Sequence, residues 1–178
     1  MEKPVFYCDC DGVILNTIEI AFDIMRDNGL NINDRRQTDL FFKSLINWNE
    51  VFSRAKVING AIEKLRYIKD SGAFKDVIIL TKLSGGYHEE GLKRALFNKT
   101  LPNIKVITLQ YGLNKGLVVK AKGNILVDDE IGNCEKWQDE EGIPILFSPY
   151  VCNPENDIIS DLEDLSKANG VKKLLKTR

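Results

Sequence analysis

Two aspartates separated by one residue stand at the end of an apolar stretch near the start of the chain. The apolar run at residues 5–8 suits a buried strand and leads into Asp9, Asp11 and Gly12. Side chains alternate along a strand, so Asp9 and Asp11 begin on the same side, and Gly12 lets the backbone turn sharply. Two buried carboxylates are costly without a cation or a reaction to serve. The alternative is a strand that simply ends in an Asp-Gly turn.

Polar residues follow two further apolar runs. The run at residues 124–127 leads into the acidic pair Asp128-Asp129, and the run at residues 77–80 leads into Thr81. The carboxyl ends of strands in an open α/β sheet are where ligands bind. These side chains are therefore expected at one edge of a common sheet, beside the first aspartate pair.

The ordered set of motifs resembles the haloacid dehalogenase (HAD) superfamily of phosphohydrolases. That family has Asp-x-Asp-Gly, an apolar strand ending in Thr or Ser, a lysine, and an acidic pair after another strand. The chain has these in the same order over residues 4–147, with Lys115 as the lysine. The acidic pair followed by Asn133 and Trp137, together with a small helical insert, is similar to the 5′-nucleotidase-like branch.

The resemblance implies a role for each motif residue. Asp9 would attack phosphorus and form an aspartyl-phosphate, and Asp11 would protonate the leaving oxygen and then deprotonate the hydrolytic water. Thr81 would donate its hydroxyl to a phosphoryl oxygen, unless it serves only as a helix cap or strand-end hydroxyl. Lys115 would neutralise phosphoryl charge, with Lys120 as the alternative lysine. Lys82, next to Thr81, is expected to point to solvent, with a phosphate contact as the alternative.

Mg²⁺ is the expected cofactor because every available ligand is an oxygen atom. By resemblance, the ligands are the Asp9 carboxylate, the Asp11 backbone carbonyl and Asp128. Asp129 would ligate directly or through water, or else orient the site or hold Lys115.

Composition places the chain among ordinary soluble globular proteins. It has 178 residues, with 43% hydrophobic and 29% charged residues. A formal net charge of −1 gives no electrostatic case for nonspecific binding to nucleic acid or membranes. The four cysteines form no Cys-x-x-Cys pair, and no signal peptide or membrane-spanning run is present, so a cytoplasmic location is expected. The single histidine excludes a centre with several histidine ligands.

Alternating apolar runs and helical periodicity predict an α/β fold. We expect a Rossmann-like, doubly wound, mostly parallel sheet in three α/β/α layers, with strands at residues 4–10, 77–80, 104–109, 125–127 and 143–147. In the helix predicted at residues 87–98, Leu92, Ala95 and Leu96 are expected to face inward. A final helix is predicted over residues 157–168.

The segment between the first two strands is too long for a loop and has apolar faces of its own. By resemblance, residues 17–56 form a small helical cap over the active site, and residues 1–16 and 57–178 form the α/β core domain. The alternative is that these helices are layers of the main domain.

The sequence therefore predicts a Mg²⁺-dependent phosphohydrolase acting on a small phosphate monoester, with a nucleoside 5′-monophosphate as the candidate substrate. The alternatives are a phosphatase acting on a nucleic-acid end or a phosphoprotein, and a non-catalytic Mg²⁺-binding interaction module. Near-neutral charge and a cap that restricts access count against a nucleic-acid partner. The sequence alone gives no oligomeric state.

Overall fold

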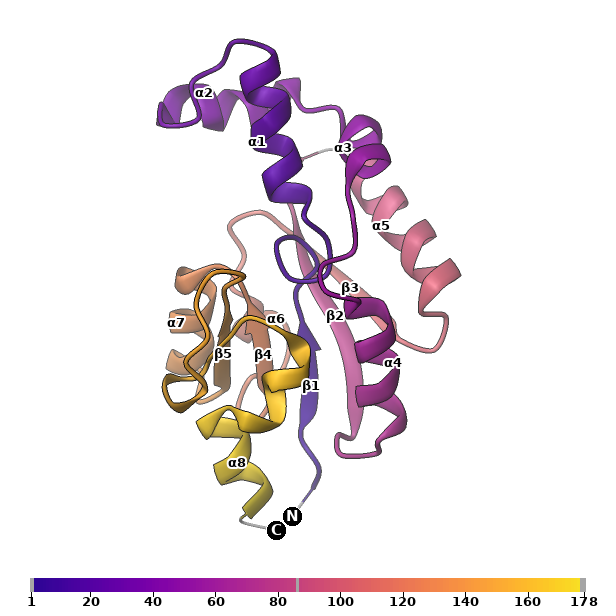
Figure 1. Ribbon diagram of the computed structural model, residues 1–178, viewed down its shortest axis with the longest axis vertical. Helices are drawn as coiled ribbons and strands as arrows, with labels where there is room; N and C mark the ends of the chain where they lie inside the picture. Colours follow the sequence, from indigo (N-terminus) through magenta and orange to yellow (C-terminus); the bar gives the residue numbers. More distant parts are fainter. Residues whose placement is uncertain (1, 86, 177–178) are drawn as a thin grey trace.

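The computed structural model describes residues 2–85 and 87–176, which form a parallel sheet flanked by helices (Figure 1). The six strands run in the order β3-β2-β1-β4-β5-β6, and every pairing between them is parallel. This confirms the predicted α/β class. The strands are β1 (Val5–Cys8), β2 (Asp76–Leu83), β3 (Lys105–Gln110), β4 (Ile125–Asp128), β5 (Ile143–Phe147) and β6 (Ile158–Ile159).

Helices cover both faces of the sheet. They are α4 (Ala61–Asp70), α5 (Tyr87–Thr100), α6 (Lys115–Val118), α7 (Ile131–Asp139) and α8 (Asn169–Lys176). Alternate residues of β1 enter two separate apolar clusters: Phe6 packs in the cluster that contains Leu65 of α4, and Tyr7 packs in the cluster that contains Trp137 of α7. The alternation along a buried strand thus builds the predicted three layers.

The register of the sheet sets where the polar strand ends meet. Cys8 of β1 pairs with Ile79 of β2 on one side and with Val127 of β4 on the other. Asp9 therefore emerges beside the ends of both neighbouring strands. Thr81 lies inside β2, two residues before its end, because the strand continues through Leu83, beyond its predicted end at residue 80.

The segment between β1 and α4 is helical and lies beyond the carboxyl ends of the strands (Figure 1). It comprises α1 (Thr17–Asp27), α2 (Arg35–Leu40), a π-helical turn (Phe41–Leu45) and α3 (Trp48–Arg54). These helices share an apolar cluster of their own, which contains Met25 and Val51. The backbone N–H of Asn16 donates to the Lys56 carbonyl oxygen at 3.1 Å, so the two connections to this segment lie side by side. The division into core and cap domains stays a prediction.

The prediction of a helix over residues 157–168 is wrong. Asp157 adopts left-handed backbone angles, Ile158 and Ile159 pair with β5 as β6, and a 3-10 helix follows at Leu162–Lys167. Residues 159, 162 and 165 are buried, and this spacing is compatible with the observed strand and 3-10 helix as well as with an α-helix. The spacing of the apolar residues therefore did not distinguish the two structures.

Candidate active site

Three carboxylates meet at the carboxyl edge of the sheet. Asp9 directly follows β1, Asp128 ends β4, and Asp129 follows it. One oxygen from each of the three lies within 4.8 Å of the others. The Asp9 backbone N–H donates to the Val127 carbonyl oxygen at 2.9 Å, which fixes Asp9 against β4. A set made only of carboxylate oxygens is the kind that Mg²⁺ binds.

Gly12 leaves room for the Asp129 carboxylate. Its φ of +76° lies in the left-handed region, which side chains other than glycine rarely adopt. A Cβ at this position would also lie 2.1 Å from Asp129 Oδ2. The glycine of the Asp-x-Asp-Gly motif thus provides both the turn and the space for an acidic side chain more than a hundred residues away.

Lys115 joins two of the three carboxylates. It begins α6, and its side chain is almost fully buried. Its Nζ lies 2.8 Å from Asp9 Oδ1 and 2.7 Å from Asp128 Oδ2. Lys120, the alternative lysine, is exposed and has no such contact among the described residues. The structure thus brings Lys115, and not Lys120, to the acidic cluster.

The pKa values show an excess of negative charge. Burial raises the pKa of Asp9 to about 7, with Lys115 opposing and Asp128 adding to the rise. Burial and the neighbouring Asp9 and Asp128 raise the pKa of Asp129 to about 8. Burial lowers the pKa of Lys115, but Asp9 and Asp128 outweigh it and the net shift is upward. One buried ammonium therefore does not balance three carboxylates.

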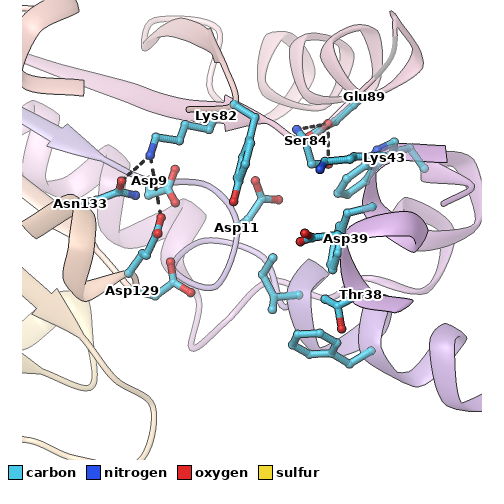
Figure 2. Close-up of a pocket in the computed structure, with 16 residues that line it drawn as sticks. Asp9, Asp11, Thr38, Asp39, Lys43, Lys82, Ser84, Glu89, Asp129 and Asn133 are labelled. Atoms are coloured by element: carbon cyan, nitrogen blue, oxygen red, sulfur yellow. Dashed lines mark hydrogen bonds and ion pairs between the residues drawn. The ribbon is translucent and has the colours of Figure 1, made fainter. Parts of the chain in front are cut away.

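Asn133 and Lys82 extend the contacts of Asp128. The Asn133 amide donates to both carboxylate oxygens of Asp128, at 3.0 and 3.2 Å, and accepts a hydrogen bond of 2.5 Å from Lys82 Nζ. Figure 2 shows Lys82 reaching Asn133 beside Asp9. The expectation that Lys82 points to solvent is wrong, because β2 continues past it and directs its side chain toward α7. Burial lowers the pKa of Lys82.

Asp11 is held by three donors from three different elements. Thr17 Oγ1 of α1 donates to Oδ1 at 2.6 Å, and Thr81 Oγ1 of β2 donates to Oδ2 at 3.2 Å. Lys93 Nζ of α5 donates to Oδ2 at 2.5 Å. The Thr81 hydroxyl predicted to contact phosphate is thus buried and directed at Asp11 in this structure.

Lys93 is a residue that the sequence did not point to. The expected inward face of α5 is wrong at Ala95, which is exposed, whereas Leu92 and Leu96 are half-buried and pack against apolar clusters. The fully buried stripe is Glu89, Lys93 and Phe97. Lys93 Nζ contacts Glu89 Oε1 at 2.7 Å as well as Asp11. The available signal was the spacing of four residues between Glu89 and Lys93, which is also the spacing of ordinary surface ion pairs.

A cavity of about 390 Å³ opens between the sheet edge and the helices at residues 17–54. Figure 2 shows Asp9, Asp11 and Asp129 on one side of it, and Thr38, Asp39 and Lys43 on the other. Side chains from the helical segment supply most of the apolar wall: Ile18, Phe22, Phe42 and Trp48. The carboxylates therefore face a space large enough for a small organic molecule.

No curated protein and no protein-family model matches the chain in sequence. Solved structures of similar fold include a HAD-superfamily hydrolase from Ehrlichia chaffeensis, with a TM-score of 0.58 and 13% identity, covering 98% of this chain and 99% of that one. They also include a hydrolase from Pseudomonas syringae, with a TM-score of 0.58 and 12% identity, covering 99% and 100%. YfnB from Bacillus subtilis, assigned to the HAD hydrolases and bound to magnesium, has a TM-score of 0.58 and 13% identity, covering 93% and 98%. The chain thus has the fold of HAD hydrolases.

Within residues 2–85 and 87–176, no helix has both the length and the apolar character needed to cross a membrane.

Proposed function

We propose that this protein is a Mg²⁺-dependent phosphohydrolase of the HAD superfamily that cleaves small phosphate monoesters. The observation that carries the proposal is the meeting of Asp9, Asp128, Asp129 and Lys115 at the carboxyl edge of the sheet, with Asp11 two residues after Asp9. The likeness in fold to HAD hydrolases supports the same reaction class.

The residues present fit a divalent cation. Asp9 Oδ1 is buried and accepts no well-aligned hydrogen bond from the described residues, so only the nearby Lys115 ammonium offsets its charge. The Asp129 carboxylate is mostly buried beside two other acids, which raises its pKa. Mg²⁺ held by Asp9, Asp128, Asp129 and the Asp11 carbonyl would supply the positive charge that lets a carboxylate approach a phosphate.

The reaction proceeds in two displacements. In the first, an Asp9 oxygen bonds to phosphorus, the bond to the leaving oxygen breaks, and Asp11 gives that oxygen a proton. In the second, a water oxygen attacks the aspartyl-phosphate, Asp11 takes its proton, and the bond from Asp9 to phosphorus breaks. The products are an alcohol and inorganic phosphate. Lys115 stabilises the phosphoryl oxygens, and Thr81 joins it once its hydroxyl turns from Asp11 to the substrate.

The cavity favours a small substrate with an apolar portion. Phe22 and Phe42 meet edge to face, with ring centroids 6.0 Å apart, in the wall contributed by the helical segment. Such a wall can hold a planar ring, which supports a nucleoside 5′-monophosphate as the substrate and a place in the 5′-nucleotidase-like branch. The helices that line one side of the cavity count against a bulky phosphoprotein or duplex end (Figure 1). A protein that only bound Mg²⁺ would not need a cavity lined by these helices, so their presence also counts against a non-catalytic Mg²⁺-binding module.

The cysteines support a cytoplasmic location. Cys8, Cys10 and Cys134 are buried as free thiols, and Cys152 is exposed as a free thiol. Free thiols persist in reducing compartments. We therefore extend the proposal to an enzyme that acts on a cytoplasmic phosphorylated metabolite.

Phosphate release tests the proposal. Wild-type protein is assayed with and without Mg²⁺ against nucleoside monophosphates, sugar phosphates and 4-nitrophenyl phosphate, beside Asp9→Asn and the exposed control Asp139→Asn. The expected result is turnover that needs Mg²⁺, is abolished by Asp9→Asn and is unchanged by Asp139→Asn. Full activity of Asp9→Asn would refute the covalent route, and turnover only on macromolecules would refute the small substrate.

A further inference from the structure

We infer that the Glu89–Lys93 pair of α5 is a positioning device for Asp11, which holds this carboxylate where it exchanges protons with the leaving oxygen. The inference rests on the proposed function, in which Asp11 is the acid and base. It adds two residues that lie outside the four HAD motifs and touch neither Asp9 nor the acidic pair among the described contacts.

Lys93 is bound on every side. Its side chain is 0% exposed, and its Nζ lies 2.5 Å from Asp11 Oδ2, 2.7 Å from Glu89 Oε1, 3.0 Å from Thr81 Oγ1 and 2.9 Å from the Lys82 carbonyl oxygen. An ammonium has three protons, and here it has four acceptors within reach. The side chain therefore has no freedom to turn away from Asp11.

Glu89 anchors the other end of the pair. Its Oε2 accepts hydrogen bonds from the backbone N–H groups of Ser84 and Gly85, at 2.8 and 3.3 Å, and its Oε1 faces Lys93. Figure 2 shows Glu89 against Ser84 at the edge of the cavity. The segment after β2, Glu89, Lys93 and Asp11 thus form one connected chain of hydrogen bonds.

Trp48, at the start of α3 in the helical segment, packs against the Lys93 end of this set of hydrogen bonds. The Lys93 ammonium lies 5.8 Å from the centroid of the Trp48 ring, within the range of cation–π contacts. Trp48 is itself buried. A buried charge pair is screened little by solvent, so the attraction between Lys93 and Asp11 is strong.

This arrangement fixes one carboxylate oxygen and leaves the other to a weaker partner. Oδ2 of Asp11 is bound by Lys93 and Thr81, whereas among the described residues Oδ1 is bound only by the Thr17 hydroxyl. A general acid must be held within hydrogen-bonding reach of the atom that it protonates. Without Lys93, the hydroxyls of Thr17 and Thr81 would be the only side chains in the described part of the chain that orient Asp11.

A purely structural role for the pair makes a different prediction. A buried ion pair that only stabilises the fold would affect all substrates alike when it is lost. A pair that acts through Asp11 should affect substrates in proportion to their need for a proton on the leaving oxygen. Phenolate needs that proton far more than 4-nitrophenolate does, so the two aryl phosphates separate the roles.

The experiment compares Lys93→Met with wild type on phenyl phosphate and 4-nitrophenyl phosphate in saturating Mg²⁺. We expect kcat on phenyl phosphate to fall roughly 10- to 100-fold, less than the full contribution of about 10²- to 10⁴-fold typical of a general acid or base, because Asp11 itself remains. On 4-nitrophenyl phosphate, kcat should fall less than about 3-fold. KM should stay unchanged on both. The double variant Asp11→Asn/Lys93→Met should be no slower on phenyl phosphate than Asp11→Asn alone.

Controls separate this outcome from loss of folding. Lys64→Met removes a lysine of the Lys64–Asp161 ion pair, neither member of which lines the cavity, and should change neither rate. If Lys93→Met does not fold, Glu89→Gln takes its place. This variant keeps the side-chain shape but removes the negative charge that faces Lys93. It should show the same dependence on the leaving group, with a smaller fall in kcat. Equal losses on both substrates, or additive losses in the double variant, would overturn the inference.

A second measurement does not depend on activity. The ammonium protons of a buried, ion-paired lysine exchange slowly and give a resolved ¹⁵N signal in NMR spectra. We expect this signal for Lys93 in wild type and a large change in it in Asp11→Asn, but not in Asp9→Asn. A signal indifferent to Asp11→Asn would overturn the positioning role even in an active enzyme, whereas absence of Asp9-dependent turnover would overturn only the proposed function.

Discussion

Replacing Gly12 by alanine should weaken Mg²⁺ binding far more than it destabilises the fold. The added Cβ would lie 2.1 Å from Asp129 Oδ2 and 2.5 Å from Asp129 Cγ, against ordinary van der Waals contact at 3.4 Å or more. The carboxylate must therefore move by on the order of 1 Å, several times the roughly 0.2 Å tolerance of a metal–ligand distance. Because the atoms that clash belong to a side chain that can rotate, the backbone need not shift.

Gly29 provides a matched control for the backbone cost. It has a φ of +71°, close to the +76° of Gly12, and a Cβ there would meet nothing within 4 Å. Each substitution should cost about 1–2 kcal/mol of the free energy of unfolding, which is the usual penalty for a side chain in the left-handed region. Only Gly12→Ala should also lower the Mg²⁺ affinity, by about 10- to 100-fold, as typical for disturbed metal-ligand support.

Urea unfolding of the metal-free proteins measures the first quantity, and the Mg²⁺ concentration that gives half-maximal phosphate release measures the second. Equal Mg²⁺ requirements in Gly12→Ala and Gly29→Ala would refute the reasoning, because they would mean that the position of Asp129 does not matter to the metal. A Gly12→Ala protein that is far less stable than Gly29→Ala would show instead that the clash spreads into the backbone.

Replacing the buried Lys115 by Met leaves two carboxylates without their cation and should lower the free energy of unfolding by about 3–5 kcal/mol. The same change at the exposed Lys122 should lower it by less than about 1 kcal/mol. Urea titrations compare the two variants. Folding raises the pKa of Asp9 to about 7 and that of Asp129 to about 8, so between about pH 4 and pH 8 the folded metal-free protein keeps protons that the unfolded chain has lost. The free energy of unfolding of the metal-free protein should therefore fall as the pH rises through this window. Saturating Mg²⁺ should offset the loss. A metal-free protein that is more stable at the alkaline end would contradict this prediction. Phe42→Ala removes part of the cavity wall and should raise KM for the preferred substrate more than it lowers kcat, and a loss confined to kcat would count against a binding role.

The strands were predictable because each of the first five is an apolar run bounded by polar residues. Burial on both faces requires this composition, and the run at residues 77–80 shows it most clearly. The end of the chain lacked such a signal. There, the two-residue strand β6 and the 3-10 helix at Leu162–Lys167 owe their form to Asp157 in left-handed geometry and to the edge of β5.

The acidic cluster was predictable because its members end adjacent parallel strands. Asp9 follows β1 and Asp128 ends β4, so the order of strands alone brings them together. Lys115 was harder to predict, because it depends on a short helix capped by the Asn114 side chain, which accepts from the Gly116 backbone N–H. Lys82 was misplaced because the length of β2, and not the identity of the residue, decides where its side chain goes.

Helix α5 shows why Lys93 could not be recognised from its own sequence. Two pairs with the same spacing stand one residue apart on this helix: Glu89–Lys93 and Glu90–Arg94. The first pair is almost wholly buried and ends on Asp11, whereas the side chains of the second are 46% and 39% exposed. Successive residues are rotated by about 100° around the helix axis, so one pair faces the protein interior and the other faces solvent. The carboxylate of Asp11, supplied by the turn after β1 and 82 residues earlier in the chain, is what makes a buried ammonium stable at position 93. Local spacing on the helix carries no information about it.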